Sequence, residues 1–258
     1  MKKTISLLIA LTALLAILTA CSSTNNDKTS TVIPPTTSTS QSDGVESGAQ
    51  EQDGHHILIA YFTRLDNTKA TLDEIIQGGG PYGSLGDSFE SADVDAIASA
   101  SITVVNGQAQ GNVETMAQII QNTVGGDLFS IQTADSYPIN YDELIDLGGE
   151  EKSAAARPEL STQVENMADY DVIFLGYPNW WYDMPMAMYS FLEEYDLSGK
   201  TIIPFAASAG SGFSGTISSI QELEPEAVVM ENGLHIPMGE VANGQAEIEA
   251  WISELGIF

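Results

Sequence analysis

The sequence has little of what metal, disulfide and nucleic-acid chemistry usually needs. Its 258 residues include one cysteine, three histidines and only eight lysines and arginines. A single cysteine cannot form a disulfide within the chain, and so few soft ligands exclude an ordinary zinc or iron–sulfur site. We therefore expect no metal site. The net charge of −28 repels phosphate backbones, so we also expect no nucleic-acid partner. Any redox chemistry would therefore depend on a bound organic cofactor.

The N-terminal residues have the composition of an export signal. A basic start, Lys2-Lys3, precedes an apolar run from Ile5 to Leu18. The next residues, Leu18-Thr19-Ala20-Cys21, resemble the lipobox of bacterial lipoproteins, in which the cysteine is lipidated and the preceding peptide is removed. The alternative, an uncleaved membrane helix, needs about 20 apolar residues, which this run does not supply. We therefore expect residues 1–20 to be a signal peptide and Cys21 to carry a lipid anchor at the cell membrane, outside the cytoplasm.

Residues 21–54 differ in composition from the rest of the chain. They are rich in serine and threonine, contain Pro34-Pro35, and offer few apolar side chains for a core. A flexible coil of this length spans an r.m.s. distance of about 30 Å. We expect a disordered tether that separates the membrane anchor from a folded domain over residues 55–258.

Short apolar runs in this domain predict the strands of a parallel sheet. They are continuous rather than alternating, as in strands covered on both faces, and they are Ile57–Phe62, Asp127–Gln132, Asp171–Gly176, Thr201–Ala207 and Ala227–Met230. Helical patterns separate them, over Val113–Thr123, Tyr141–Ala156, Met184–Glu194, Thr216–Leu223 and Glu247–Leu255. This alternation predicts an α/β fold, a doubly wound five-stranded parallel sheet of order 2-1-3-4-5. In such sheets ligands bind beyond the carboxyl ends of the strands.

The loop after the first strand has the polar groups of a phosphate site. Thr63-Arg64 follows the strand, and short polar side chains continue to Asn67-Thr68. The helix that feeds the second strand begins only at Gly111-Asn112-Val113, which implies an insertion over residues 65–110. The insertion is expected to end in a hairpin, with Ile102–Val105 turning at Asn106-Gly107.

Two phosphate sites are compatible with this arrangement. We favour one built from Thr63, Arg64, Asn112 and Val113, because only the later helix runs directly into the second strand. The alternative is a compact loop that ends at Asn67-Thr68. For Arg64 itself, an ion pair with a surface acid is the competing interpretation.

The loops after the third and fourth strands complete the candidate site. The third carries several aromatics at a strand end, Pro178-Asn179-Trp180-Trp181-Tyr182-Asp183, and suits a stacking platform for a flat ligand. Alternatively, both tryptophan rings pack on the helix that begins at Met184. The fourth, Ser208-Ala209-Gly210-Ser211-Gly212, is small, so its backbone can approach a ring edge and donate N–H groups, or it is simply a tight turn. It lacks the spacing of a hydrolase nucleophile turn, so we interpret His235 as an ordinary strand-end residue.

Together these segments resemble the flavodoxin-like family, in particular short-chain flavodoxins, here with an interrupted phosphate loop. The likeness covers nearly all of residues 55–258 and rests on residues 59–64, Gly111-Asn112, Tyr137-Pro138, 176–181, Pro185-Met186, and 198–201 through 210–213. The resemblance implies non-covalent FMN, with its phosphate on the first loop and its isoalloxazine against the loop from Pro178 to Asp183. It places the pyrimidine edge on Ser208, Gly210, Ser211 and Gly212. Family members commonly have threonine where this chain has Val113, so one hydroxyl contact is missing.

The implied function is electron transfer by a membrane-tethered FMN protein. Its partner would be a redox protein or a small electron acceptor, and no catalytic acid or base is required. Two alternatives stay open: an FMN-dependent NAD(P)H:quinone-type reductase, and a surface binding module without flavin. Asp95–Ser101 also resembles in part the segment to which bacterial flavin transferases attach FMN, with serine in place of the acceptor threonine. Covalent flavin at Ser101 is therefore a further possibility.

Overall fold

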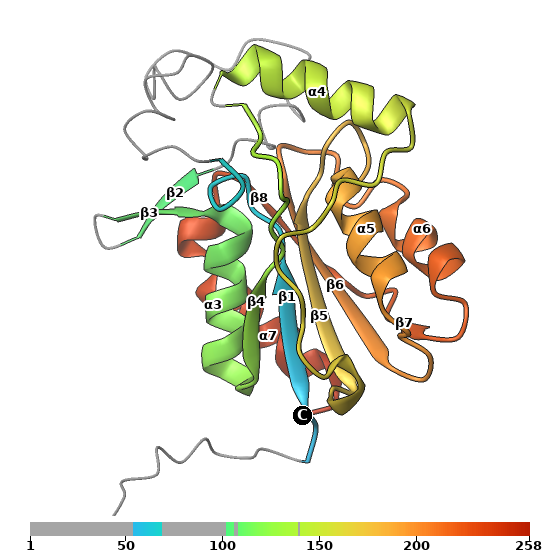
Figure 1. Cartoon of the computed structure of the whole chain (residues 1–258). Helices are drawn as coiled ribbons and strands as arrows, with labels where there is room; N and C mark the ends of the chain where they lie inside the picture. The colour runs from blue at the N-terminus through green and yellow to red at the C-terminus, as the bar shows by residue number, and fades with distance from the viewer. Residues whose placement is uncertain (1–53, 69–101, 106–107, 139) are drawn as a thin grey trace, which may run out of the picture. The chain divides into compact units, whose positions relative to one another are not determined.

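A computed structural model describes residues 54–68, 102–105, 108–138 and 140–258 (Figure 1). These residues all belong to one compact unit, Ser47–Phe258. Cys21, the predicted signal peptide, nearly all of the predicted tether, Ser101 and most of the predicted insertion lie outside the described residues.

A parallel sheet forms the centre of the domain. Its strands are β1 (Ile57–Tyr61), β4 (Asp127–Ser130), β5 (Val172–Pro178), β6 (Thr201–Ser208), β7 (Val228–Val229) and β8 (Leu234–Pro237). They lie in the order β4-β1-β5-β6, with β7 and β8 both paired to β6, and every pairing is parallel. Each predicted apolar run overlaps one of these strands, and the predicted strand order is confirmed.

The edge of the sheet differs from the prediction because it is divided between β7 and β8. Met230 N donates to Ile202 O at 2.9 Å, so alternate residues of β6 face this edge. Pro204 faces it too and has no N–H to donate, and a Cβ added to Gly233 would lie 2.6 Å from Pro204 O. The edge strand therefore breaks opposite Pro204 and resumes as β8. The strand β8 was not predicted, although residues 234–237 alternate between buried and half-buried side chains.

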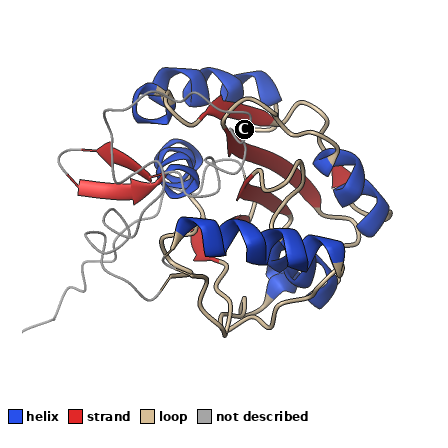
Figure 2. Cartoon of the chain, turned by 90° about the horizontal axis from the view of Figure 1, so that it is seen from above, coloured by secondary structure: helices blue, strands red, loops and turns tan. Residues whose placement is uncertain are grey.

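Helices cover both faces of the sheet (Figure 2). The helices α3 (Asn112–Val124) and α7 (Gln245–Leu255) pack on one face, and α5 (Met186–Glu194) and α6 (Thr216–Leu223) pack on the other. These are four of the five predicted helices, and each is confirmed to within about two residues, the usual uncertainty of a helix end. Their apolar sides form two core clusters, one on each side of the sheet.

The helix α4 (Tyr141–Ser153) is placed differently from the others. It follows β4 and lies at the carboxyl end of the sheet, on the α5 side (Figures 1 and 2). Asn140 caps it, because its side-chain oxygen accepts hydrogen bonds from Asp142 N and Glu143 N. Two adjacent glycines, Gly148-Gly149, lie inside the helix, where each costs about 1 kcal/mol relative to alanine.

The predicted hairpin also forms. The strands β2 (Ile102–Val105) and β3 (Gln108–Gly111) pair antiparallel, and β3 runs directly into α3. The predicted turn at Asn106-Gly107 lies outside the described residues. Two short 3₁₀ helices, η1 (Met167–Asp169) and η2 (Val241–Asn243), complete the domain. None of the described helices combines the length and the apolar character that crossing a membrane requires.

Candidate functional site

The loop after β1 is folded inward and held by Asn67. Asn67 Nδ2 donates to Thr63 O at 2.9 Å and to Ile131 O at 3.0 Å. Asn67 Oδ1 accepts from Thr133 N at 2.8 Å and from Thr133 Oγ1 at 3.1 Å. An amide side chain has two donor and two acceptor positions, so the Asn67 side chain is fully used within the protein. It therefore connects this loop to the loop after β4 instead of facing a ligand.

Thr63 lies beside the start of α3, although the two are far apart in the sequence. A Cβ added to Gly111 would fall 2.1 Å from Thr63 Oγ1, so only glycine fits at this position. Asn112 Nδ2 donates to Met238 O at 3.1 Å, while its buried Oδ1 has no hydrogen-bond partner among the residues that the structure describes. The Val113 side chain belongs to the core. The structure thus brings Thr63 next to Gly111-Asn112, and Val113 can face a ligand only through its backbone.

Arg64, the remaining member of the favoured phosphate set, is an interior side chain. It is 4% exposed, and its Nη2 donates to Pro138 O at 3.3 Å. Pro138 follows Tyr137, whose N–H donates to Asn67 O at 2.8 Å. The guanidinium therefore lies toward the connection between β4 and α4, as a fixed charge inside the protein rather than at its surface.

Two carboxylates lie close to the start of α3. Glu114 accepts a hydrogen bond from Gly111 N at 3.1 Å, and Asp66 accepts one from Ser130 Oγ at 2.5 Å. Burial raises the pKa of Glu114 despite the hydrogen bond from Gly111, and the negative charge of Asp66 raises it further. The N-terminus of a helix attracts anions, but here the protein already places its own anion there. A phosphate at this position must displace Glu114 or overcome its charge.

The predicted aromatic loop forms a tight turn at the end of β5. Trp180 N donates to Asp183 O at 2.7 Å, and Asp183 N donates to Trp180 O at 2.9 Å. The two residues between them have positive φ angles, 53° for Trp181 and 60° for Tyr182. This is the backbone of a type I′ turn, for which asparagine and glycine are the usual residues. Holding bulky side chains there costs about 1–3 kcal/mol each, which points to a use for their position.

Trp180 is a core side chain. It is 4% exposed and packs edge-to-face on Phe62 and Tyr137, with ring centroids 5.5 and 5.2 Å away. A Cβ on Gly148 of α4 would lie 3.4 Å from the Trp180 ring. Trp180 therefore packs on α4 and on the loop after β1, within the core cluster that also contains side chains of α5.

Trp181 and Tyr182 are on the outside of the same turn. Trp181 lies against Gly149 of α4, and its Nε1 donates to Ile145 O at 3.1 Å. Its side chain is 41% exposed, and that of Tyr182 is 62% exposed. Both tryptophans thus use α4 as support, and a Cβ at either glycine of α4 would be in ordinary van der Waals contact with a ring. Trp181 and Tyr182 are the aromatics of this turn that a ligand can reach.

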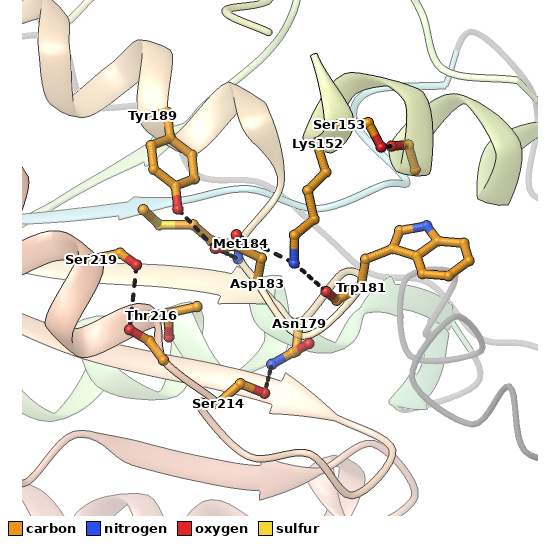
Figure 3. Close-up of polar contacts among 12 residues, drawn as sticks. Lys152, Ser153, Asn179, Trp181, Asp183, Met184, Tyr189, Ser214, Thr216 and Ser219 are labelled. Carbon is orange, nitrogen blue, oxygen red and sulfur yellow. Dashed lines mark hydrogen bonds and ion pairs between the residues drawn. The ribbon is translucent and has the colours of Figure 1, made fainter. Parts of the chain in front are cut away.

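Lys152, which the sequence analysis did not single out, fastens the turn to α4. Its Nζ donates to Trp181 O at 2.5 Å and lies 3.5 Å from Asp183 Oδ2 (Figure 3). Asp183 Oδ1 accepts from Met184 N and from Tyr189 OH, both at 2.9 Å. Burial raises the pKa of Tyr189 to about 12, so this hydroxyl remains a donor at neutral pH. The Asp183 carboxylate is therefore occupied in holding the turn, and no spacing in the sequence connects it to Lys152.

Asn179 joins the loops after β5 and β6. Its backbone N–H donates to Ala207 O at 3.0 Å, and its Nδ2 donates to Gly212 O at 3.0 Å and to Ser214 Oγ at 3.1 Å. The Asn179 side chain is fully buried, and within the described part of the chain its Oδ1 has no hydrogen-bond partner. Pro178, just before it, is the last residue of β5 and pairs in register with Ala207.

Ser208 organises the loop after β6 from inside. Its Oγ accepts from Gly210 N at 3.2 Å and from Gly212 N at 3.0 Å, and it lies 2.7 Å from His235 Nε2. These two N–H groups, which the sequence analysis assigned to a ligand, point toward Ser208. Ser208 is itself fully buried, so it affects a ligand through the loop that it holds, whereas Ser211 lies half-buried at the tip.

A cavity of about 960 Å³ lies beside the tryptophan turn. It is lined by Trp181 and by residues along α4 and just after it, namely Ile145, Asp146, Gly149, Glu150, Lys152, Ser153 and Ala154. Of the predicted site residues that the structure describes, Trp181 alone lines it. The cavity therefore lies on the outer side of the turn and is lined by both acidic and basic side chains.

Comparison with known proteins agrees with this architecture. No curated protein is significantly similar in sequence. The crystal structures of candidate flavoproteins from Bacteroides eggerthii and Bacteroides uniformis each match 78% of this chain, with 22% identity and a TM-score of 0.53, and cover 98% and 99% of their own chains. A flavoprotein from Lactobacillus acidophilus, crystallised in complex with FMN, matches 73% of this chain and 97% of its own, with 14% identity and a TM-score of 0.47. The family model for flavodoxin matches residues 101–255, more than half of the chain, and the chain therefore belongs to the flavodoxin family.

Proposed function

We propose that this flavodoxin-family chain binds FMN and transfers electrons, tethered to the outside of the cell membrane by a lipid on Cys21. The observation that carries the proposal is that polar loops meet at the carboxyl ends of β1, β5 and β6. Ligands of doubly wound sheets bind at this edge. When bound, FMN supplies electron transfer, and the protein supplies binding, orientation and electrostatics.

Two buried acceptor atoms fit this cofactor. Asn112 Oδ1, at the start of α3, and Asn179 Oδ1, beside the tryptophan turn, both lack a hydrogen-bond partner in the portion of the chain that is described. A buried acceptor without a partner costs about 1–3 kcal/mol. FMN carries matching donors, because its ribityl chain has hydroxyl groups and its ring has an N–H. We assign Asn112 to the ribityl phosphate end and Asn179 to the ring end.

The outer side of the tryptophan turn suits the flat ring system. Trp181 is supported from behind by α4, and Lys152 and Asp183 hold its backbone in place. Tyr182 is the more exposed of the two accessible aromatics. Such a rigid aromatic surface binds a planar ring with little loss of conformational entropy and excludes water from one of its faces.

The phosphate end is less favourable electrostatically. We infer that the phosphate loop is interrupted by the insertion, with Thr63 on one side and Gly111-Asn112 on the other. Arg64 supplies a buried positive charge near this loop, while Glu114 and Asp66 oppose a dianion. The chain as a whole is also strongly acidic, which disfavours adding negative charge to a bound cofactor.

The simplest test is the colour of the purified full chain. We expect an absorption spectrum with the two visible bands of an oxidised flavin, and release of FMN rather than riboflavin on denaturation. An electron carrier should then show no sustained NAD(P)H consumption with a quinone acceptor, whereas the reductase alternative requires it. A colourless protein that also fails to bind added FMN would establish the flavin-free alternative.

The carboxylate at the start of α3 generates a second prediction. Glu114→Gln keeps an acceptor for Gly111 N–H but removes a negative charge, so it should strengthen FMN binding about tenfold while riboflavin binding changes little. Arg64→Ala should have the opposite selectivity and weaken FMN more than riboflavin. Titration of both ligands, followed by quenching of flavin fluorescence, measures the difference.

Glu247→Gln is the matched control, because Glu247 occupies the first turn of α7, a helix on the same face of the sheet. It should leave both affinities unchanged. Equal effects of Glu114→Gln on FMN and riboflavin would place the phosphate elsewhere.

The three aromatics of the turn should differ in what their substitution changes, FMN binding or protein stability. Trp181→Ala and Tyr182→Ala should each weaken FMN severalfold and restore flavin fluorescence, because stacking contributes about 0.5–1.5 kcal/mol beyond buried area. Trp180→Ala should instead lower the free energy of unfolding by about 3–5 kcal/mol, since it empties a core position. Phe258→Ala removes a partly exposed aromatic of the C-terminus as a control. If Trp181→Ala and Tyr182→Ala both bind FMN with wild-type affinity and quench its fluorescence as before, the isoalloxazine does not bind on this surface.

The anchor is tested separately. Cys21→Ser should move the protein from the membrane fraction to the soluble fraction, or leave it unprocessed, because no thiol remains for lipidation. Fractionation and intact mass measure both effects. An unchanged mass and an unchanged membrane partition would contradict the lipoprotein assignment, independently of flavin binding.

A further inference from the structure

Ser208 and His235 meet where the last two strands of the sheet end. His235 belongs to β8, which pairs with β6 through Ala206 and His235, and its Nε2 lies 2.7 Å from Ser208 Oγ. Ser208 is fully buried, and His235 is half-buried. The two residues are separated by a helix and an edge strand in the sequence, so no motif connects them.

The hydrogen-bond geometry determines which atom carries the proton. A hydroxyl oxygen can accept two hydrogen bonds and donate one. Both acceptor positions of Ser208 Oγ are taken, by Gly210 N at 3.2 Å and by Gly212 N at 3.0 Å. The Ser208 proton must therefore point to His235 Nε2, which can accept it only when it is unprotonated. His235 is then neutral, with its own proton on Nδ1.

This arrangement sets the conformation of the loop after β6. The N–H groups of Gly210 and Gly212 turn inward to Ser208, and Gly212 adopts a φ of 60°, which glycine accepts without strain. From the other side, Asn179 Nδ2 holds Gly212 O at 3.0 Å. The loop is thus held between β8 and β5.

The same strand end also reaches the start of α3. Met238 N donates to Ser208 O at 2.9 Å, and Met238 O accepts from Asn112 Nδ2 at 3.1 Å. The segment from His235 to Met238 therefore connects the two ends of the proposed cofactor site, the ring end at the β6 loop and the phosphate end at α3.

We propose that His235 is a positioning residue of the cofactor site: as a neutral acceptor of the Ser208 proton, it folds the β6 loop into its binding conformation before the ligand arrives. The protonation state and the loop conformation are inferred from the hydrogen bonds of Ser208 and do not depend on FMN. The effect on affinity rests on the proposed FMN function.

The first part of the test needs no flavin. In the ¹⁵N-labelled full chain at neutral pH, long-range proton–nitrogen NMR should show His235 with Nδ1 protonated and Nε2 unprotonated. The amide resonances of Gly210 and Gly212 should shift in Ser208→Ala and His235→Leu and remain near their wild-type positions in His235→Gln, whose side-chain oxygen can accept the Ser208 proton. A protonated Nε2, or glycine amides that do not respond to His235→Leu, would overturn the proposal.

The second part measures FMN binding. Ser208→Ala and His235→Leu should each weaken FMN about tenfold. The first removes the oxygen that accepts the loop N–H groups, and the second removes the acceptor that orients the Ser208 proton. His235→Gln should restore affinity to within a few-fold of wild type. His56→Leu is the control, since His56 is an exposed histidine at the other end of β1 and contacts Asp171 through its backbone N–H and C=O.

The two parts separate the possible failures. Wild-type affinity in His235→Leu, in a folded protein that binds FMN, would overturn the positioning role. Loss of affinity that His235→Gln does not restore would do the same, because it would show a packing effect rather than a hydrogen bond. If the wild-type chain binds no FMN, the proposed function fails, and the NMR measurements still decide the state of His235.

Discussion

The parallel pairing of β1, β5 and β6 is the constraint on which the rest of the structure depends. The hydrogen-bond ladder continues past the strands, because Phe62 N donates to Gly176 O at 2.9 Å and Asn179 N donates to Ala207 O at 3.0 Å. Backbone hydrogen bonds between the strands therefore determine where each of the three loops leaves the sheet. A Cβ on Gly176 would lie 2.2 Å from the Phe205 ring, so β5 and β6 also depend on a glycine for their close packing. The position of the candidate site is thus a property of the sheet.

The tryptophan turn shows how a strained local conformation is maintained by its surroundings. Two positive φ angles at bulky residues are unfavourable by themselves. They are offset by the burial of Trp180, by the indole bond of Trp181 to α4, and by Lys152 on the turn's carbonyl. The helix α4 is in turn held on the loop after β4, where Tyr137 OH donates to Glu151 Oε2 at 3.0 Å. Turn and helix therefore stabilise each other, and neither conformation follows from its own residues.

Charge gives the site an unusual balance for a nucleotide cofactor. Glu114 occupies the N–H group at the start of α3, a place where a phosphate would otherwise gain most from the helix dipole. Arg64 is buried on the other side of the first loop, and Lys152 is committed to the tryptophan turn. The hydrogen-bonding atoms of the site fit a flavin nucleotide, whereas its acidic groups oppose the phosphate dianion. In the proposed complex, the ring and the ribityl chain should therefore contribute most of the affinity.

By itself the sequence determined the layers of the fold, because continuous apolar runs and helical periodicity report burial, and burial follows from local composition. It also predicted that the candidate loops lie at one edge of the sheet, because parallel strands bring their carboxyl ends together. Only the tertiary structure decided which of those residues can face a ligand. Trp180 is in the core while Trp181 is half exposed, and the N–H groups of Gly210 and Gly212 turn toward Ser208. Lys152 and the strand β8 were not predicted, and His235 was expected only as an ordinary strand-end residue. The physical reason is the same in each case: the contacts that matter join residues distant in the sequence, and such contacts leave no periodicity or spacing in it.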